Sequence, residues 1–306
     1  MSRSAFGILR GFVLAVSILQ PAQRLMAEDV KPKPLTVGTQ AGQEWSGNGL
    51  MMKFCWCPPG KFLMGSPQDE LDRRPDEGQV SVALTTGYWL GKFEVTQGEW
   101  RRIMGATLLE QRDKAIADST NKKPRKPAGE GDGLPMYYIQ YAEASEFCVE
   151  LTAREKQAGR LPADWVYTLP TEAQWEYACR AGTSTATAMG NTLESTQANF
   201  DGNYPYNSTN RGEFRGRSVQ VGSYTANAWG LCDMHGNVWE MCIDRYAHRL
   251  PGGSDPVTTE TASNRVCRGG GWRWSGPECR SASRSTYGPT QRSSILGMRI
   301  VLLPPT

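Results

Sequence analysis

"WGLCDMHGNVWEMCIDRY", residues 229–246, is the stretch of sequence that says most about the fold. Its centre is a Gly-Asn-Val-Trp-Glu turn, and we predict that Trp239 packs in the core behind it. We also predict that His235, inside this turn, hydrogen-bonds to loop backbone. The chain has one other histidine, His248, which we predict to be exposed. A Ser-His-Asp triad would have to use one of these two histidines, and neither favours it.

Two amphipathic helices are predicted on the N-terminal side of this stretch. The first covers residues 141–157, and one of its faces carries Tyr141, Ala144, Phe147, Cys148 and Leu151. The second begins in "LPTEAQWEYACRAG", residues 169–182. Thr171 and Gln174 form a capping-box pattern there, and Gly182 is placed to end the helix.

Farther out, the pattern changes to short strands. Residues 50–66 predict two strands around a turn, and residues 80–105 predict two more, followed by a helix that opens at Thr96 with Glu99 three positions on. Residues 110–134 are polar and charged and predict a solvated loop. Short strands are expected again around residues 219–224, 266–274 and 295–302.

The fold class is therefore predicted as α+β, a single loop-rich domain with two helices and many short strands. The long loops lack a large apolar face, so something else must order them. Ions, disulfides and buried tryptophans are the physical candidates.

The N-terminus reads as a secretory signal peptide. Residues 1–27 carry Arg3 and Arg10, an apolar run from residue 11 to 19 and no acidic residue, and cleavage is expected after Ala27. The apolar run is far shorter than the roughly 20 residues that span a bilayer. We predict an exported protein, periplasmic, in the cell envelope or secreted, with a flexible lead-in at residues 28–48 and a domain at residues 49–306.

Net charge and cysteine content bear on two further questions, which are whether the protein binds nucleic acid and whether it forms disulfides. Removing residues 1–27 takes away three of the 34 basic residues and none of the 31 acidic ones, so the mature chain is neutral. A neutral chain gives no reason to expect nucleic acid as a partner. Eight cysteines in an exported chain predict disulfides, although their connectivity does not follow from sequence. Cys55 and Cys57 are too close together for the usual zinc pair.

Several motifs together resemble one protein family. They are "YTLPTEAQWEYACRAGT" (167–183), the opening stretch, "RVCRGGGW" (265–272) and "LGMRIV" (296–301), with "GKFLMGS" and "WLGKFEVTQGEW" upstream. Their order and spacing are similar to those of the formylglycine-generating enzymes, also called sulfatase-modifying factors. The resemblance covers roughly residues 50–302. It implies a single domain related to C-type lectins.

The resemblance also implies a chemistry, and here the chain departs from the family. The enzymes oxidise a cysteine of a sulfatase peptide to Cα-formylglycine, with O₂ and a copper(I) ion, Cu⁺, held by two cysteines. Counted from Arg268, the first thiol position is Trp274 and the second is Cys279. A soft Cu(I) site requires both sulfurs. We therefore predict a binding or scaffolding member without the oxidase activity, the alternative being a genuine formylglycine-generating oxidase with Cys279 as its catalytic thiol.

Cys279 has a structural interpretation as well. The resemblance implies a disulfide from Cys179 to the C-terminal loop, and Cys179 to Cys279 is the preferred pairing. Cys267 is a second possible partner for Cys279. A disulfide would make Cys279 unavailable as a nucleophile or ligand.

Two structural Ca²⁺ sites are implied by the same resemblance. The first would use Asp233, Gly236, Val238 and Glu240, and the second Asn199 and Phe200. Carboxylate and carbonyl oxygens suit a hard cation. The alternative is that the acids are only surface charges.

A ligand groove is predicted around the C-terminal loop, lined by Trp274, Arg273 and Arg280. Its ligand would be a peptide, a protein, with sulfatases among the candidates, or a glycan. Trp272, like Trp239, is instead expected in the core, and Arg268 and Arg299 are expected to hold buried loop carbonyls.

Overall fold

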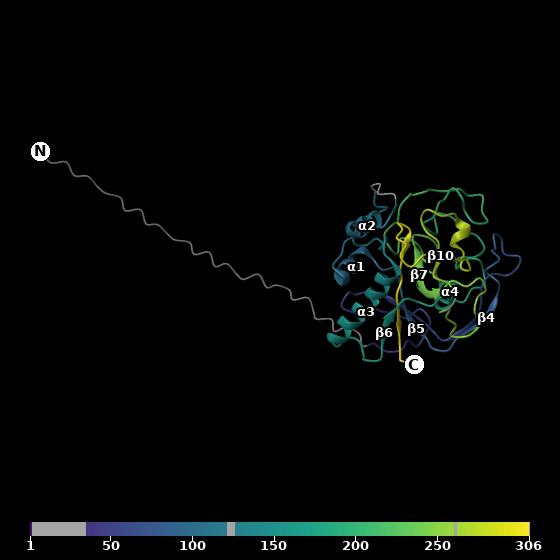
Figure 1. Cartoon of the computed structure of the whole chain (residues 1–306), viewed down its shortest axis with the longest axis horizontal. Helices are drawn as coiled ribbons and strands as arrows, with labels where there is room; N and C mark the ends of the chain where they lie inside the picture. The colour runs from purple at the N-terminus through teal and green to yellow at the C-terminus, as the bar shows by residue number, and fades with distance from the viewer. Residues whose placement is uncertain (2–34, 121–125, 260–261, 306) are drawn as a thin grey trace. The chain divides into compact units, whose positions relative to one another are not determined.

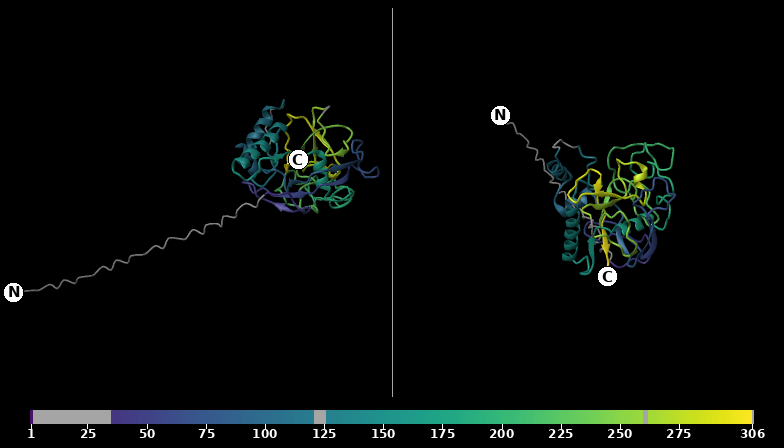
Figure 2. Two further views of the ribbon diagram at one scale, coloured as in Figure 1. Left: turned by 90° about the horizontal axis from the view of Figure 1, so that it is seen from below. Right: turned by 45° about the vertical axis from the view of Figure 1, so that its right-hand side comes forward.

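The computed structural model describes Met1 and residues 35–120, 126–259 and 262–305. The predicted signal peptide, apart from Met1, and the first part of the predicted lead-in lie outside the described residues. From residue 35 on, the helices α1, α2 and α3 gather on one side of the fold, and long irregular segments fill the other (Figure 1). Figure 2 shows the same separation from two further sides.

Short strands alternate with few helices along the chain. The helices are α1 (Gln97–Met104), α2 (Leu108–Ala117), α3 (Tyr141–Gln157), α4 (Glu172–Arg180) and the 3₁₀ turn η1 (Gly276–Cys279). The strands are β1 (Glu44–Trp45), β2 (Phe54–Cys57), β3 (Gly60–Met64), β4 (Val80–Leu84), β5 (Tyr88–Gly91), β6 (Val166–Thr168), β7 (Trp239–Arg245), β8 (Gly253–Ser254), β9 (Arg265–Arg268), β10 (Ser285–Tyr287), β11 (Leu296–Gly297) and β12 (Val301–Leu303). The α+β prediction is confirmed.

The strands form three small sheets. Their orders are β1-β2-β5-β12-β6, β10-β9-β7-β11 and β3-β4-β8. The C-terminal strand β12 lies inside the first sheet, where Val301 pairs with both Leu90 and Thr168. Because β12 pairs with β5 and β6, which both come much earlier in the sequence, this sheet depends on long-range contacts.

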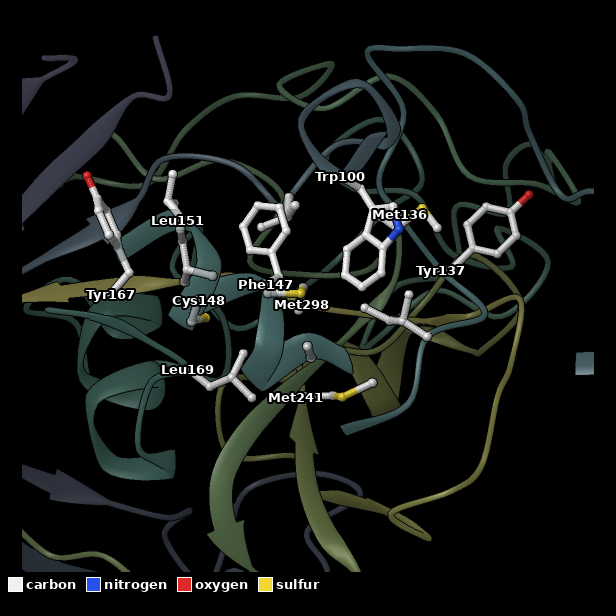
Figure 3. Close-up of a cluster of buried hydrophobic side chains, with 14 of the residues drawn as sticks. Trp100, Met136, Tyr137, Phe147, Cys148, Leu151, Tyr167, Leu169, Met241 and Met298 are labelled. Atoms are coloured by element: carbon white, nitrogen blue, oxygen red, sulfur yellow. The ribbon is translucent and has the colours of Figure 1, made fainter. Parts of the chain in front are cut away.

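The larger core lies between α1 and α3 and strands of the first two sheets, and Figure 3 shows part of it. Trp100 of α1 stacks on Phe147 of α3, with ring centroids 5.6 Å apart and an interplanar angle of 4°. Both rings are fully buried. Burial of such rings is the main favourable term that holds the helices against the sheet.

The capping motifs and the apolar face seen in the sequence predict the positions of three helices. The capping boxes at Thr96 with Glu99 and at Thr171 with Gln174 are both formed. The helix α3 covers the predicted residues and buries the predicted face apart from Tyr141, which is only partly buried. These predictions are confirmed because a cap satisfies backbone N–H groups within four residues, without help from the rest of the fold.

Three predictions about elements are wrong. The described residues contain four α-helices, of which α2 was not expected and lies partly in the segment predicted to be a loop. Residues 219–224 form turns and bends instead of a strand. Residues 35–48 are not a flexible lead-in: β1 pairs with β2, and Asn48 Oδ1 accepts a hydrogen bond from Met52 N at 2.9 Å.

Candidate functional site

The segment after β9 turns back sharply because two glycines follow Arg268. Gly269 and Gly270 have φ of 97° and 81°, in the left-handed region that favours glycine. A Cβ atom on Gly270 would lie 2.4 Å from Cys279 Sγ. The glycine backbone therefore packs directly on the sulfur, and η1 folds back over the Arg-Gly-Gly turn.

Cys279 is closed off by this packing. Its side chain is fully buried, and its Sγ lies 3.7 Å from the carbonyl oxygen of Ser275. Burial raises the pKa of the thiol well above its ordinary value, and the neighbouring Glu278 raises it further. A thiol must lose its proton to act as nucleophile or copper ligand. With Trp274 at the position of the first sulfur, the residues present do not fit a Cu(I) site.

A second buried thiol lies beside a histidine. Cys179 Sγ is 3.7 Å from His235 Nε2, a distance reminiscent of a thiol–imidazole pair. However, burial raises the pKa of Cys179 to about 12 and lowers that of His235 to about 4. A catalytic pair needs shifts in the opposite directions, toward thiolate and imidazolium. The arrangement therefore stays neutral and structural.

His235 serves the loops, as predicted. Its Nδ1 lies 2.7 Å from the carbonyl oxygen of Cys279, and its Nε2 lies 3.1 Å from the backbone N–H of Ala188. The neutral ring with its proton on Nδ1 satisfies both backbone groups. The imidazole thus joins two loops and has no nitrogen left for a reaction.

The predicted disulfide between Cys179 and Cys279 is not formed. All eight cysteines of the sequence are described, and each is a buried, free thiol. Cys179 faces the backbone of Met234 and the hydroxyl of Ser281, whereas Cys279 faces Ser275. Cys267, the alternative partner, is fully buried in the larger core.

The predicted groove residues divide into two groups. Arg273 and Trp274 are exposed, and Trp274 rests edge-on against Trp239 with ring centroids 6.4 Å apart. Arg280 does not line the groove. Its side chain is fully buried, so its assignment as a groove residue is wrong. Trp272 and Trp239 are buried, as expected.

Arg280 instead holds the loop of residues 66–78. Its guanidinium donates to both carboxylate oxygens of Glu77 at 2.8 Å, to Glu70 at 2.5 Å and to the carbonyl of Asp72. This bidentate geometry is the strong form of the arginine–carboxylate pair. About 200 residues of chain separate the partners, so the contact ties the N-terminal half of the domain to its C-terminal loop.

Two glutamates on one face of α4 complete a buried ionic network. Glu172 accepts from Arg284 at 2.7 and 2.9 Å. Glu176 accepts from Arg180 at 2.9 Å and from Arg268. Burial alone would raise the pKa of Glu176, but Arg180 and Arg268 outweigh it and hold the pKa below its usual range.

The same arginines hold loop carbonyls. Arg268 donates to Ser281 and Ser283, and Arg299 donates to Gly91 and Cys232, as predicted for Arg268 and Arg299. The carboxylates that pair with these arginines were not predicted from the sequence. Glu172 and Glu176 could have indicated them, because they lie four residues apart on one helix face in a chain with many C-terminal arginines.

Asp233 offers a position that suits a cation. It has φ of 59° and lines a small cavity of about 10 Å³, room for one water or ion. Its Oδ2 accepts from Gly222 N, while its buried Oδ1 has no hydrogen-bond partner in the described part of the chain. Burial raises the pKa of Asp233 to about 6. An unpartnered buried carboxylate oxygen is a ligand that Ca²⁺ accepts.

The other predicted Ca²⁺ ligands are less free. Glu240 is fully buried, with both oxygens engaged by Arg299 at 2.7 and 2.8 Å and one of them also by Trp175 Nε1. Gly236 and Val238 lie in the same buried turn. Asp233 is thus available as a Ca²⁺ ligand, as predicted. Glu240 is not, because both of its oxygens are already paired with Arg299.

The second predicted set is partly free. Asn199 is buried, its Oδ1 lacks a hydrogen-bond partner among the described residues, and its Nδ2 donates to Asn237 at 3.0 Å. Its backbone carbonyl accepts from Asn237 N at 2.8 Å. Phe200 is buried in a small separate core. Asn199 therefore has one side-chain oxygen that is available to bind an ion. The two predicted Ca²⁺ ligand sets are neighbours, because Asn199 hydrogen-bonds to Asn237, which lies between Gly236 and Val238.

Comparison with known proteins agrees with this geometry. The domain family described as sulfatase-modifying factor enzyme 1-like matches residues 46–303. Among curated relatives, the formylglycine-generating enzyme of Mus musculus is 24% identical over 293 residues, 81% of this chain and 74% of that protein. The formylglycine-generating enzyme of Mycobacterium tuberculosis is 31% identical over 222 residues, 67% of this chain and 63% of that protein.

A relative named inactive is equally similar. Inactive C-alpha-formylglycine-generating enzyme 2 of Bos taurus is 24% identical over 250 residues, 69% of this chain and 78% of that protein. Among solved structures, PvdO from Pseudomonas aeruginosa has a TM-score of 0.68 at 23% identity and covers 87% of this chain and 100% of its own. Treponema denticola variable protein 1 has a TM-score of 0.64 at 23% identity, with coverages of 89% and 99%.

Proposed function

The chain belongs to the sulfatase-modifying factor family, and on this premise we propose that it is a binding or scaffolding member without copper-oxidase activity. The family match covers residues 46–303, nearly the whole domain. Membership alone leaves the activity open, because both active enzymes and a protein named inactive are among the relatives.

The closed state of Cys279 is the observation that carries the proposal. The thiol is fully buried under the backbone of Gly270, its pKa is raised, and the exposed Trp274 stands where the family has its first copper-binding sulfur. Copper(I) chemistry needs two accessible thiolates on one site. One protonated, enclosed thiol cannot supply them.

The alternative is a genuine formylglycine-generating oxidase. It would bind Cu⁺ through Cys279 after η1 opens and would convert a sulfatase cysteine to Cα-formylglycine. The 31% identity to the Mycobacterium tuberculosis enzyme is what favours it. Because position 274 is a tryptophan, Cys279 would be the one sulfur that this loop offers to Cu⁺. This alternative therefore needs a second copper ligand from elsewhere.

Incubation with a Cys-X-Pro-X-Arg peptide, Cu(I) and O₂ tests the proposal. We expect no aldehyde product by mass spectrometry of the peptide, while an active formylglycine-generating enzyme, run in parallel, produces it. Aldehyde formed by the wild-type chain and lost in Cys279→Ser would establish the oxidase alternative instead. Thermal unfolding of both proteins checks that the variant is folded.

We further propose that the protein is exported and that its ligand is a peptide, a protein such as a sulfatase, or a glycan. Within the described residues, no helix is long and apolar enough to cross a membrane. N-terminal sequencing of the protein from fractionated cells tests export, and a mature chain that begins at Glu28 is the expected result.

We also propose a structural Ca²⁺ with Asp233 as its central ligand. Support comes from the unpartnered Oδ1 of Asp233 beside a small cavity and from the unpartnered Oδ1 of Asn199. Such an ion would neutralise Asp233 and order loops that have little apolar surface of their own.

A further inference from the structure

The surface beside Trp274 is built from two segments that hydrogen-bond to each other. Asp201 N donates to the carbonyl oxygen of Trp274 at 2.7 Å, and Gly276 N donates to that of Tyr204 at 2.8 Å. Phe214 stacks on Trp272 with ring centroids 6.3 Å apart. We call this the basic aromatic surface; it consists of Tyr204, Arg211, Phe214, Arg217, Arg273 and Trp274.

Among the described residues, the exposed aromatic rings all belong to this surface. Tyr204, Phe214 and Trp274 are 61%, 43% and 39% exposed. In the part of the chain that the structure describes, every other phenylalanine, tyrosine and tryptophan is buried or half-buried. A fold that buries nearly all its other rings and gathers these three on neighbouring segments presents a site for stacking.

The arginines of the surface are free of acidic partners. Most described arginines pair with a carboxylate or hold a loop carbonyl, as Arg280 and Arg268 do. Arg211, Arg217 and Arg273 are exposed and have no ion pair within the described residues. Of the acids in these segments, Glu213 pairs with Arg215 at 3.3 Å, and Asp201 accepts hydrogen bonds from Asn203. Free guanidinium groups attract and bind carboxylate or sulfate groups in bidentate fashion.

A cavity of about 560 Å³ adjoins the surface. Its wall combines polar groups with rings: the amide of Asn203, the hydroxyl groups of Ser208, Thr209 and Ser275 and the side chain of Arg211 lie beside the rings of Tyr204, Pro205 and Pro277. No leucine, isoleucine, valine or methionine lines it. Rings beside hydroxyl and amide groups suit a sugar, which presents an apolar ring face and hydroxyl groups together.

We propose that this surface binds an acidic oligosaccharide, an inference that rests on the proposed binding function and specifies its ligand. Arg211, Arg217 and Arg273 bind the carboxylate or sulfate groups, while the apolar faces of the sugar rings stack on Trp274 and Tyr204. The hydroxyl and amide groups of the cavity bind ring hydroxyls. A peptide of acidic residues would match the charge, but it has neither the ring hydroxyls nor the ring faces that this wall suits.

Calorimetric titration of the full chain with defined polymers tests the proposal. Oligogalacturonate carries carboxylates, sulfated dextran oligosaccharides carry sulfate esters, uncharged dextran lacks both, and poly-glutamate carries carboxylates on a peptide. We expect one or both acidic oligosaccharides to bind, and the two arms tell carboxylate from sulfate recognition. Dextran and poly-glutamate should not bind, and affinity should fall between about 0.05 and 0.5 M NaCl as charges are screened.

Matched variants locate the site. The double variant Arg217→Ala with Arg273→Ala should weaken binding about tenfold or more, as expected when charged hydrogen bonds are lost. Trp274→Ala should also weaken it, and Trp274→Phe should keep much of it because a ring remains. Arg249→Ala is the control, since Arg249 is exposed and lies beside His248, at a different cavity. All four sites are exposed, so melting temperatures should stay unchanged.

Three results would overturn the proposal. Equal binding of poly-glutamate would make the surface an acidic-peptide site, and equal weakening by Arg249→Ala would reveal non-specific charge attraction. Absence of any binding would reject the glycan ligand, but it would not affect the proposal that the protein lacks oxidase activity. Aldehyde formation in the peptide assay, by contrast, rejects the proposed function itself, so the two failures can be told apart.

Discussion

Arg280 shows how a side chain predicted for a ligand groove became part of the interior. It lies between Glu77 and Glu70, and its guanidinium is hydrogen-bonded on both sides. Burial opposes the charge of Arg280, but the two glutamates outweigh this cost and raise its pKa. A buried charge is tolerated only when such partners are present.

Replacing Arg280 should therefore be costly. Arg280→Ala leaves Glu77 buried without its counter-ion, and we expect the free energy of unfolding in urea to fall by about 3–5 kcal/mol. Arg249→Ala, at an exposed arginine, should change it by less than about 0.5 kcal/mol. If Arg280→Ala cost no more than this control, the network would not be a main support of the loop.

Asp244 gives a prediction about pH. Its carboxylate accepts from Glu172 N, at the first turn of α4, and from Thr258 N. Burial, followed by repulsion from Glu172, raises its pKa from 3.8 to about 6. A raised pKa in the folded state means that the folded protein holds a proton that the unfolded chain has released. The resulting stabilisation is complete below about pH 4 and is lost as the pH rises through about 6.

Asp244→Asn removes this proton uptake. The stability advantage of wild type over the variant should shrink by up to about 3 kcal/mol between pH 4 and pH 7. Urea unfolding of both proteins at the two pH values measures it, and subtraction cancels the titration of shared groups. A constant or growing difference would show that the pKa of Asp244 is not raised.

At the scale of elements, the Arg-Gly-Gly turn determines where η1 lies. Gly270 has positive φ and no room for a side chain, since a Cβ atom would meet Cys279 Sγ at 2.4 Å. The turn and η1 are therefore packed as one unit. This unit encloses Cys279 and leaves Trp274 at the surface.

Gly270→Ala should loosen this unit. Left-handed backbone and the clash with sulfur together predict a loss of about 2–4 kcal/mol. Gly253→Ala is the matched control, because Gly253 has φ of 97° and a Cβ atom there would meet no other atom within 4 Å. Only the backbone cost of about 1 kcal/mol remains in that variant. Equal losses in thermal unfolding would mean that the contact with Cys279 contributes nothing.

Over the whole molecule, three small sheets and a few helices leave most of the chain in loops. Buried arginines join these loops to one another across large sequence separations. Acidic charge also accumulates inside: Glu94 and Asp233 are buried near Glu240, and burial raises the pKa of Glu94. Arg299 is the cation that faces these three carboxylates, which leaves up to two negative charges without a counter-charge.

Chelation tests whether Ca²⁺ supplies that counter-charge. EDTA should lower the melting temperature of wild type by about 3 °C, corresponding to about 1 kcal/mol, and added Ca²⁺ should restore it. Asp233→Asn should abolish the response, whereas Asp132→Asn, at an exposed acid, should keep it. An unchanged melting temperature, with no Ca²⁺ found by elemental analysis, would leave Asp233 a buried acid without an ion.

Much of the fold could be read from sequence where the signal is local. The caps at Thr96 and Thr171 and the apolar face of α3 are confirmed because each involves residues within one or two turns. The helix α2 was missed because it is mostly polar and buries only Leu108, Gln111 and Ala115. At the candidate site, the loss of the first thiol was visible at Trp274, but the enclosure of Cys279 was not.

The sequence by itself determined the family, the α+β class, the capped helices and the absence of a cysteine at position 274. The tertiary structure alone decided that Arg280 is buried and that His235 lies between the thiol of Cys179 and the backbone carbonyl of Cys279. It also decided that three arginines without an ion pair among the described residues share a surface with three exposed rings. The physical reason is range. A cap or an amphipathic stripe depends on neighbours in the chain, whereas burial and charge pairing depend on residues that only folding brings together.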